Sequence, residues 1–196
     1  APKSMTDRTP SRIPNESFNL VLLVRNDKGY RNLSKMITLA QFEGFFVKPR
    51  IDKDLLCKHA EGLVCLSGNM DGEISHLLLQ DKTEQAEKVG RFYLELFGKE
   101  HFFLEIQDHG LKQEKILIPK ILQLAKNLGV DVVATNDCHY MSREDSFAHD
   151  IARCISMGVT LNDPHPTYET TEYNFKSFEE MQELFQNHPE VLSNTI

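Results

Sequence analysis

Four short apolar stretches, separated by longer segments with helical spacing, constrain the fold of this 196-residue chain most strongly. They predict buried strands at 18–24, 63–66, 102–106 and 130–134, since short continuous apolar runs bounded by turn residues are typical of strands covered on both faces. Buried strands that alternate with amphipathic helices indicate βαβ units and a mostly parallel sheet. The chain is therefore expected to be an α/β protein.

The segments between these strands carry the spacing and the caps of helices. Asn26 is placed to cap a helix that continues to about residue 40. Residues 1–16 are rich in Pro, Ser, Thr and Arg and predict an irregular lead-in. The other expected elements are helices at about 52–59, 74–78, 83–97, 113–128, 143–157, 178–187 and 189–196, and a short strand near 172–176.

Composition fits one globular domain with a proper core, because 40% of the residues are hydrophobic. A net charge of −7 argues against nonspecific coating of nucleic acid by the whole surface. No apolar run reaches membrane-spanning length and no signal-peptide pattern opens the chain. Four cysteines without CxxC spacing predict reduced thiols and a cytoplasmic protein. The missing initiator Met predicts a segment of a longer protein, or a processed one.

Asp137 and His139 follow the last of these strands directly and are the leading candidate for a metal site. Side chains two residues apart in extended backbone share one face, and a carboxylate with an imidazole is a common metal-ligand pair. Alternatively, Asp137 caps the next helix and His139 is a surface residue. His109 follows the preceding strand and could join the pair, or could be a hydrogen-bonded structural residue.

Other chemistry is weakly indicated. Asp71 and Glu73 fall in the first turn of a helix, where a carboxylate is favourable without any further role. No nucleophile elbow surrounds Ser67, and the sequence has neither a phosphate-binding P-loop nor a dinucleotide glycine fingerprint.

Several motifs of the chain resemble, in order and spacing, motifs of the alpha subunit of bacterial DNA polymerase III. They are residues 26–33 (NDKGYRNL), 43–50 (EGFFVKPR), 104–110 (LEIQDHG) and 134–140 (ATNDCHY), with 142–145 and the 178–195 stretch. The resemblance runs nearly end to end. It identifies residues 1–196 as a single segment of the polymerase and histidinol phosphatase (PHP) domain of that family.

The resemblance implies a partial, distorted (βα)7 barrel of mostly parallel strands whose first strands would precede Ala1. Residues 160–196 would lead toward a polymerase palm that the chain does not contain. Asp137 and His139 match the closing Asp-x-His pair of the family's metal cluster. Asn19 and Asn69 stand at two further ligand positions, where many relatives have stronger donors.

These two substitutions predict a degenerate metal site, because a neutral amide oxygen is a poor ligand for zinc-like ions. Zinc or manganese would bind weakly, and magnesium would serve the polymerase domain of the parent. The expected role is a structural and subunit-binding module of a replicative DNA polymerase, a nucleotidyltransferase. The alternatives are an active metal-dependent phosphoesterase or 3′–5′ exonuclease domain and, third, a stand-alone enzyme like histidinol phosphatase.

The expected partners are DNA through the parent polymerase, the proofreading exonuclease subunit and other replisome subunits, with no membrane. The segment alone is expected not to extend a primer, because the catalytic aspartates of the palm are not part of it. Unpaired edges of an incomplete barrel also predict self-association.

Overall fold

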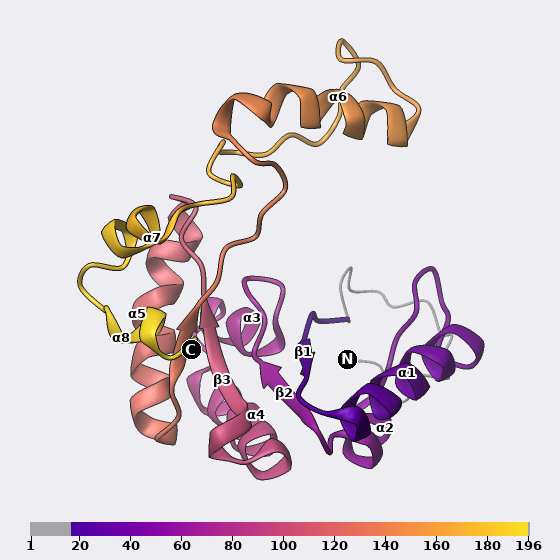
Figure 1. Ribbon diagram of the computed structural model, residues 1–196, viewed down its shortest axis with the longest axis vertical. Coiled ribbons are helices and arrows are strands. Elements are labelled where there is room, and N and C mark those ends of the chain that lie inside the picture. The colour runs from indigo at the N-terminus through magenta and orange to yellow at the C-terminus, as the bar shows by residue number, and fades with distance from the viewer. Residues whose placement is uncertain (1–16, 196) are drawn as a thin grey trace.

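A computed structural model of the chain describes residues 17–195, so the predicted lead-in at 1–16 lies outside the described residues. Four strands form one sheet in the order β1-β2-β3-β4 (Figure 1). β2 pairs with β3 and β3 with β4 in parallel, whereas β1 is antiparallel to β2. The strands are β1 (Val21–Val24), β2 (Leu63–Leu66), β3 (Phe102–Ile106) and β4 (Val132–Ala134). The prediction of an α/β protein with a mostly parallel sheet is confirmed.

Parallel strands would bring the carboxyl ends of all four predicted strands to one edge of the sheet, but β1 runs the other way. The chain leaves β1 through one helix and returns through a second, so it re-enters the sheet where β1 ended, with Val24 opposite Leu63. The start of β1 therefore lies beside the end of β2. The backbone N–H of Asn19 donates to the carbonyl of Asp71 at 2.9 Å, which attaches this start to the turn after β2.

The helices begin and end close to the predicted positions. The side chain of Asn26 accepts from the N–H of Gly29 at 3.0 Å and caps α1, as predicted. The helices are α1 (Asp27–Phe42), α2 (Lys53–His59), α3 (Glu73–Leu79), α4 (Thr83–Phe97), α5 (Lys112–Leu128), α6 (Ser146–Met157), α7 (Phe178–Leu184) and α8 (Glu190–Ser193), with 3-10 turns at Lys99–His101 and Arg143–Asp145.

The short strand predicted near 172–176 does not form. Only an isolated bridge joins Asn174 to Tyr140 in the described chain, outside the sheet. The N–H of His139 and that of Phe175 each bond across this junction, at 2.8 and 2.9 Å. The segment is thus held beside residues 139–140 by a few bonds and has no second partner strand that would extend a ladder.

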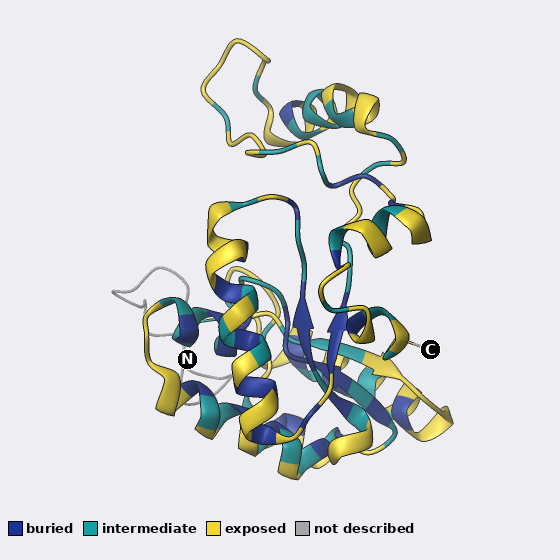
Figure 2. Cartoon of the chain, turned by 90° about the vertical axis from the view of Figure 1, so that its left-hand side faces the viewer, coloured by how far each residue is buried: buried dark blue, intermediate teal, exposed yellow. Residues whose placement is uncertain are grey.

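The core lies around β2, β3 and β4, between the sheet and helices α3, α4 and α5. In Figure 2 strands β2, β3 and β4 and the inner sides of these helices are mostly buried, whereas the outer helical faces are exposed. Phe102 and Leu104 are fully buried on β3, and Ile74, Leu78 and Ile121 are almost fully buried on the helices. Each such side chain stabilises the fold by about 1.5–3 kcal/mol relative to an exposed position.

An arm made of α6 and the loop that follows it extends away from the sheet (Figure 1). The arm leaves the body after Tyr140 and returns at Asn174, so its two ends meet at the isolated bridge. Cys154 is the only buried residue of α6. The arm therefore has little hydrophobic core of its own.

Candidate metal-binding site

A cavity of about 40 Å³ lies at the carboxyl ends of the parallel strands, large enough for an ion with roughly one or two waters. Asn69 enters it from the turn after β2 and Asp137 from the segment after β4. Glu105 on β3, and His109 just beyond that strand, line it from between. The structure thus brings together three of the residues singled out in the sequence.

His109 is buried and oriented by a carboxylate from the next helix. Its Nδ1 lies 2.7 Å from Oε1 of Glu114, and the second oxygen of Glu114 accepts from the backbone N–H of His109 (2.7 Å) and of Leu111 (3.1 Å). A carboxylate that accepts from Nδ1–H leaves Nε2 as the nitrogen with a free lone pair. Nε2 is buried and has no hydrogen-bond partner among residues 17–195.

Tyr173 closes the cavity on the side of His109. The two rings stack with their centroids 4.4 Å apart and their planes 20° from parallel. Burial, with the nearby carboxylates of Glu114 and Asp137, raises the pKa of Tyr173 to about 12. The phenol therefore stays neutral at physiological pH, and the wall it forms carries no charge.

Glu105 is a second buried carboxyl group of the cavity. One oxygen accepts from the hydroxyl of Thr135 and from the amide of Gln107 (3.4 Å), whereas Oε2 is buried without a hydrogen bond within the described chain. Desolvation raises the pKa of Glu105, and the Asp137 carboxylate adds to the effect, although the hydrogen bonds oppose it. A cation beside Oε2 would instead lower the pKa of Glu105, because an opposite charge favours the ionised form.

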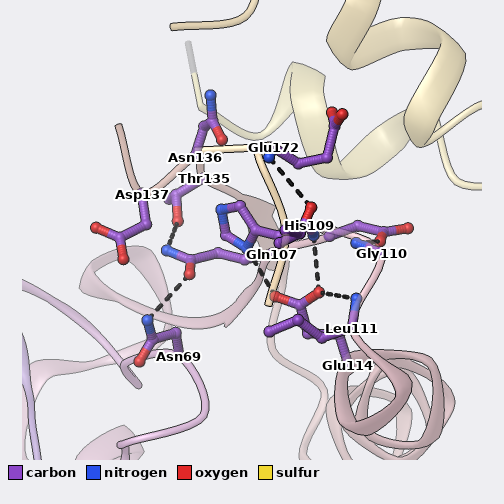
Figure 3. Close-up of polar contacts among 12 residues, drawn as sticks. Asn69, Gln107, His109, Gly110, Leu111, Glu114, Thr135, Asn136, Asp137 and Glu172 are labelled. Carbon is purple, nitrogen blue, oxygen red and sulfur yellow. Dashed lines mark hydrogen bonds and ion pairs between the residues drawn. The ribbon is translucent and has the colours of Figure 1, made fainter. Parts of the chain in front are cut away.

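A row of amide groups connects the strand ends. Asn69 Nδ2 donates to Gln107 Oε1 at 3.0 Å, and Gln107 Nε2 donates to the hydroxyl of Thr135 at 2.9 Å (Figure 3). The amide N–H group of Asn69 is thus used within the protein, and its Oδ1 accepts from the backbone N–H of Asp71 at 3.1 Å. Asn69 supplies only a neutral oxygen that already carries one hydrogen bond.

The predicted pair is close together, but only one member lines the cavity. Asp137 Oδ2 lies 3.2 Å from His139 Nε2, as expected of neighbours on one face. Asp137 also lines the cavity, whereas the ring of His139 lies among Tyr168, Tyr173 and His149 outside it. Asp137 does not cap α6, because no side-chain bond caps that helix.

Asn19 does not line this cavity. It lies in a larger hollow of about 830 Å³ between β1 and helices α1 and α2. Its backbone carbonyl runs so close to Gly68 that a Cβ there would come within 2.7 Å, and the φ of Gly68 is +79°. Only glycine fits that position, which keeps the turn carrying Asn69 close to the start of β1. Glu73 also faces the hollow, where Lys53 Nζ binds it at 2.8 Å.

Glu105 and Glu114 are the site residues that the sequence analysis missed. Glu105 interrupts an otherwise apolar strand, and a charged residue within a buried run is the signal that could have marked it. Glu114 lies at the third position of α5, where a Glu that reaches back to the start of its helix is common. That pattern predicts a local cap but gives no sign of the contact with His109.

Several of the side chains that line the cavity are of types that bind a divalent ion. His109 Nε2 and Glu105 Oε2 are unpaired donor atoms of residues that line one cavity with the carboxylate of Asp137. An imidazole with two carboxylates is a ligand set that zinc and manganese accept. A single ion fits the space better than a cluster.

The fold is consistent with a partial PHP domain, and the model of that family matches residues 4–109. The chain belongs to the PHP domain family. It is also similar to proteins named DNA polymerase III subunit alpha: 43% identical over 197 residues to that of Treponema pallidum, with the whole chain aligned. The corresponding proteins of Borreliella burgdorferi and Thermus aquaticus are 42% and 40% identical over 92% and 85% of this chain.

The chain spans only 14–17% of the length of these three relatives. Among residues 17–195, no helix is both long enough and apolar enough to cross a membrane.

Proposed function

We propose that the chain is the PHP segment of a bacterial replicative DNA polymerase, and that it acts mainly as a structural and subunit-binding module. The observation that carries this proposal is the reach of the similarity. The whole chain aligns with a DNA polymerase III subunit alpha at 43% identity, so the aligned part includes α1, α6 and α8, none of which lines the cavity. A module whose only task was hydrolysis at the strand ends would not need such similarity in these parts.

The partners follow from the parent's role. DNA is bound through the rest of the polymerase, and this segment contacts the proofreading exonuclease subunit and other replisome subunits in the cytoplasm. A net charge of −7 suits a protein partner better than direct contact of the whole surface with DNA.

The metal site in this proposal is weakened. Glu105, His109 and Asp137 hold one zinc or manganese ion, with His139 orienting Asp137 from outside. Asn69 contributes only a neutral oxygen, and Asn19 lies elsewhere. The role of His139 as a ligand in its own right stays a prediction.

Co-elution of the 196-residue chain with the proofreading exonuclease subunit of the same organism tests the main proposal. A stable complex is expected, together with no primer extension by the chain alone. Absence of a complex at micromolar concentrations, or extension of a primer by highly purified chain, would contradict the proposal.

The second candidate function is metal-dependent hydrolysis of a phosphoester, trimming a 3′ DNA end. The unpaired atoms His109 Nε2 and Glu105 Oε2 favour it, because a metal ion bound there would lower the pKa of a water. Release of nucleotides from a 3′-labelled primer in the presence of manganese, lost in Asp137→Asn but kept in Glu87→Gln, would support this function over the first.

A further inference from the structure

Three metal-ligand side chains lie together on the arm, away from the strand-end cavity. Asp150 and Cys154 are one helical turn apart on α6, and His165 lies on the loop that returns along it. One ligand atom from each lies within 4.8 Å of those of the other two. Residues four apart on a helix point to the same side, so the helix presents its carboxylate and its thiol toward the loop together.

Two of the three side chains are shielded from water, in a part of the molecule that has little else buried, whereas Asp150 is partly exposed. Cys154 is 3% exposed, and the side chain of His165 is 8% exposed. A buried cysteine is often only a small apolar residue. Here, however, it lies beside an imidazole and a carboxylate, which are not the neighbours that apolar packing provides.

His165 is oriented as a metal-binding histidine usually is. Its Nδ1 lies 2.8 Å from the backbone carbonyl of Asp163, and its Nε2 lies 3.1 Å from Oδ2 of Asp150. A ring that donates from Nδ1 to a carbonyl presents an Nε2 lone pair to the carboxylate. In the neutral ring two acceptors then face one another, which is favourable only if the ring takes up a proton or a cation lies between them. A bond from Nδ1–H to a backbone carbonyl is typical of zinc-binding histidines.

Asp150 has a further unused ligand atom. Its Oδ1 is buried and makes no hydrogen bond within the described chain. The nearest charged group is Arg153, 3.9 Å away, whose guanidinium lies 4.4 Å from the centre of the Tyr168 ring. Arg153 is therefore held partly by the aromatic ring, and it leaves Oδ1 of Asp150 with a long ion pair and no hydrogen bond.

We propose that Asp150, Cys154 and His165 bind one divalent transition-metal ion, by preference zinc, which fastens the returning loop to α6. A thiolate, an imidazole and a carboxylate form a mixed set that zinc accepts, whereas magnesium and calcium require oxygen ligands. Bond lengths of about 2.0–2.3 Å bring the ligand atoms to roughly 3.5 Å from one another. Because the ligand atoms lie within 4.8 Å of one another, the contraction needed is at most roughly 1.3 Å, which side-chain rotation provides.

The competing explanation is a protonated His165 paired with Asp150, with Cys154 as packing. The two explanations differ in one observable, which is the bond between the thiolate and the metal. Cobalt(II) is a suitable probe, because it occupies zinc sites and its bond to sulfur gives a strong near-ultraviolet absorption. The site is independent of the proposed function, so the outcome does not depend on whether the chain binds replisome subunits.

Titration of the 196-residue chain with cobalt(II) tests the proposal. We expect a sulfur-to-cobalt band that zinc displaces. In Asp137→Asn, whose strand-end site is weakened, the band should saturate at one equivalent. Cys154→Ser should abolish the band, and His165→Ala should weaken binding on the order of 100-fold. Cys57→Ser and Cys138→Ser, at exposed cysteines elsewhere, should leave it unchanged.

Absence of the band in the unsubstituted chain would overturn the proposal. So would its persistence in Cys154→Ser, or its loss in Cys138→Ser, which would place the thiolate ligand beside Asp137 instead. Because His165 lies on a loop, His165→Ala decides the question even if Cys154→Ser does not fold.

Discussion

The carboxylate of Glu114 binds His109 twice, once through the ring Nδ1 and once through the backbone N–H, each at 2.7 Å. The first bond sets which ring nitrogen faces the cavity, and the second fixes the turn that carries the ring. His109 is therefore both a structural residue and a potential ligand. The two interpretations that the sequence left open are compatible.

Replacing Glu114 with Gln should destabilise the fold by about 1–3 kcal/mol, because one of the two carboxylate oxygens becomes an NH2 group that faces N–H donors. Urea denaturation measures the change. Glu87→Gln is the matched control, since Glu87 pairs with Arg91 on the surface of α4, and it should change stability by less than about 0.5 kcal/mol. Equal effects of the two substitutions would contradict the structural role of Glu114.

Glu105→Gln should stabilise the metal-free chain relative to the unsubstituted one at neutral pH, but not at low pH. Burial raises the native pKa of Glu105 above 4.5, its ordinary value, so the native state binds the proton more tightly than the unfolded state does. Stability is then lost as the pH rises from 4.5 to the raised native value, by at most about 1.4 kcal/mol per pH unit. Urea unfolding of both proteins with chelator at pH 4 and pH 7 measures this. An identical pH dependence of the two would contradict the prediction.

Metal binding at the cavity should depend on His109 and Asp137 more than on His139. His109→Ala removes an unpaired buried nitrogen, and Asp137→Asn removes a cavity carboxylate, so each should weaken manganese binding on the order of 100-fold. His139→Ala should cost only about tenfold if it acts through Asp137. Manganese titration followed by electron paramagnetic resonance measures the three constants. A loss with His139→Ala as large as with His109→Ala would instead make His139 a direct ligand.

Strand β1 should mediate self-association of the chain. It lies at one edge of the sheet, and its residues Leu23 and Val24 are 49% and 43% exposed. An exposed apolar edge strand is a template for pairing with another chain. Leu23→Lys should therefore shift the population toward monomer, as measured by light scattering after gel filtration. Val47→Lys is the control, because Val47 is 87% exposed outside the sheet, and equal shifts would exclude β1 as the interface.

The apolar runs predicted the strands well because burial on both faces leaves a local signal. β2 and β3 have the predicted bounds, and β1 and β4 begin only a few residues later. The direction of β1 leaves no such signal in the sequence. It depends on whether the segment between β1 and β2 returns the chain to the edge of the sheet where β1 ended or carries it to the opposite edge. That long-range choice places Asn19 beside the turn that carries Asn69, although the two residues line different hollows.

Within the site, the sequence predicted contacts between residues that are neighbours along the chain, but it did not predict contacts between residues of different elements. Asp137 and His139 are neighbours as predicted, at 3.2 Å. The contacts of His109 with Glu114 and of Glu105 with Thr135 join residues from different elements. Likewise, His165 meets Asp150 only because the loop folds back along α6, which no spacing in the sequence predicts.

The meeting of the arm's two ends at Tyr140 and Asn174 has an evolutionary consequence. A segment that departs and returns at one point can change in length or composition while the scaffold beneath it keeps its coordinates. Among the described residues, 141–172 are therefore a segment where lineages can acquire new surfaces at little risk to the folding of the sheet.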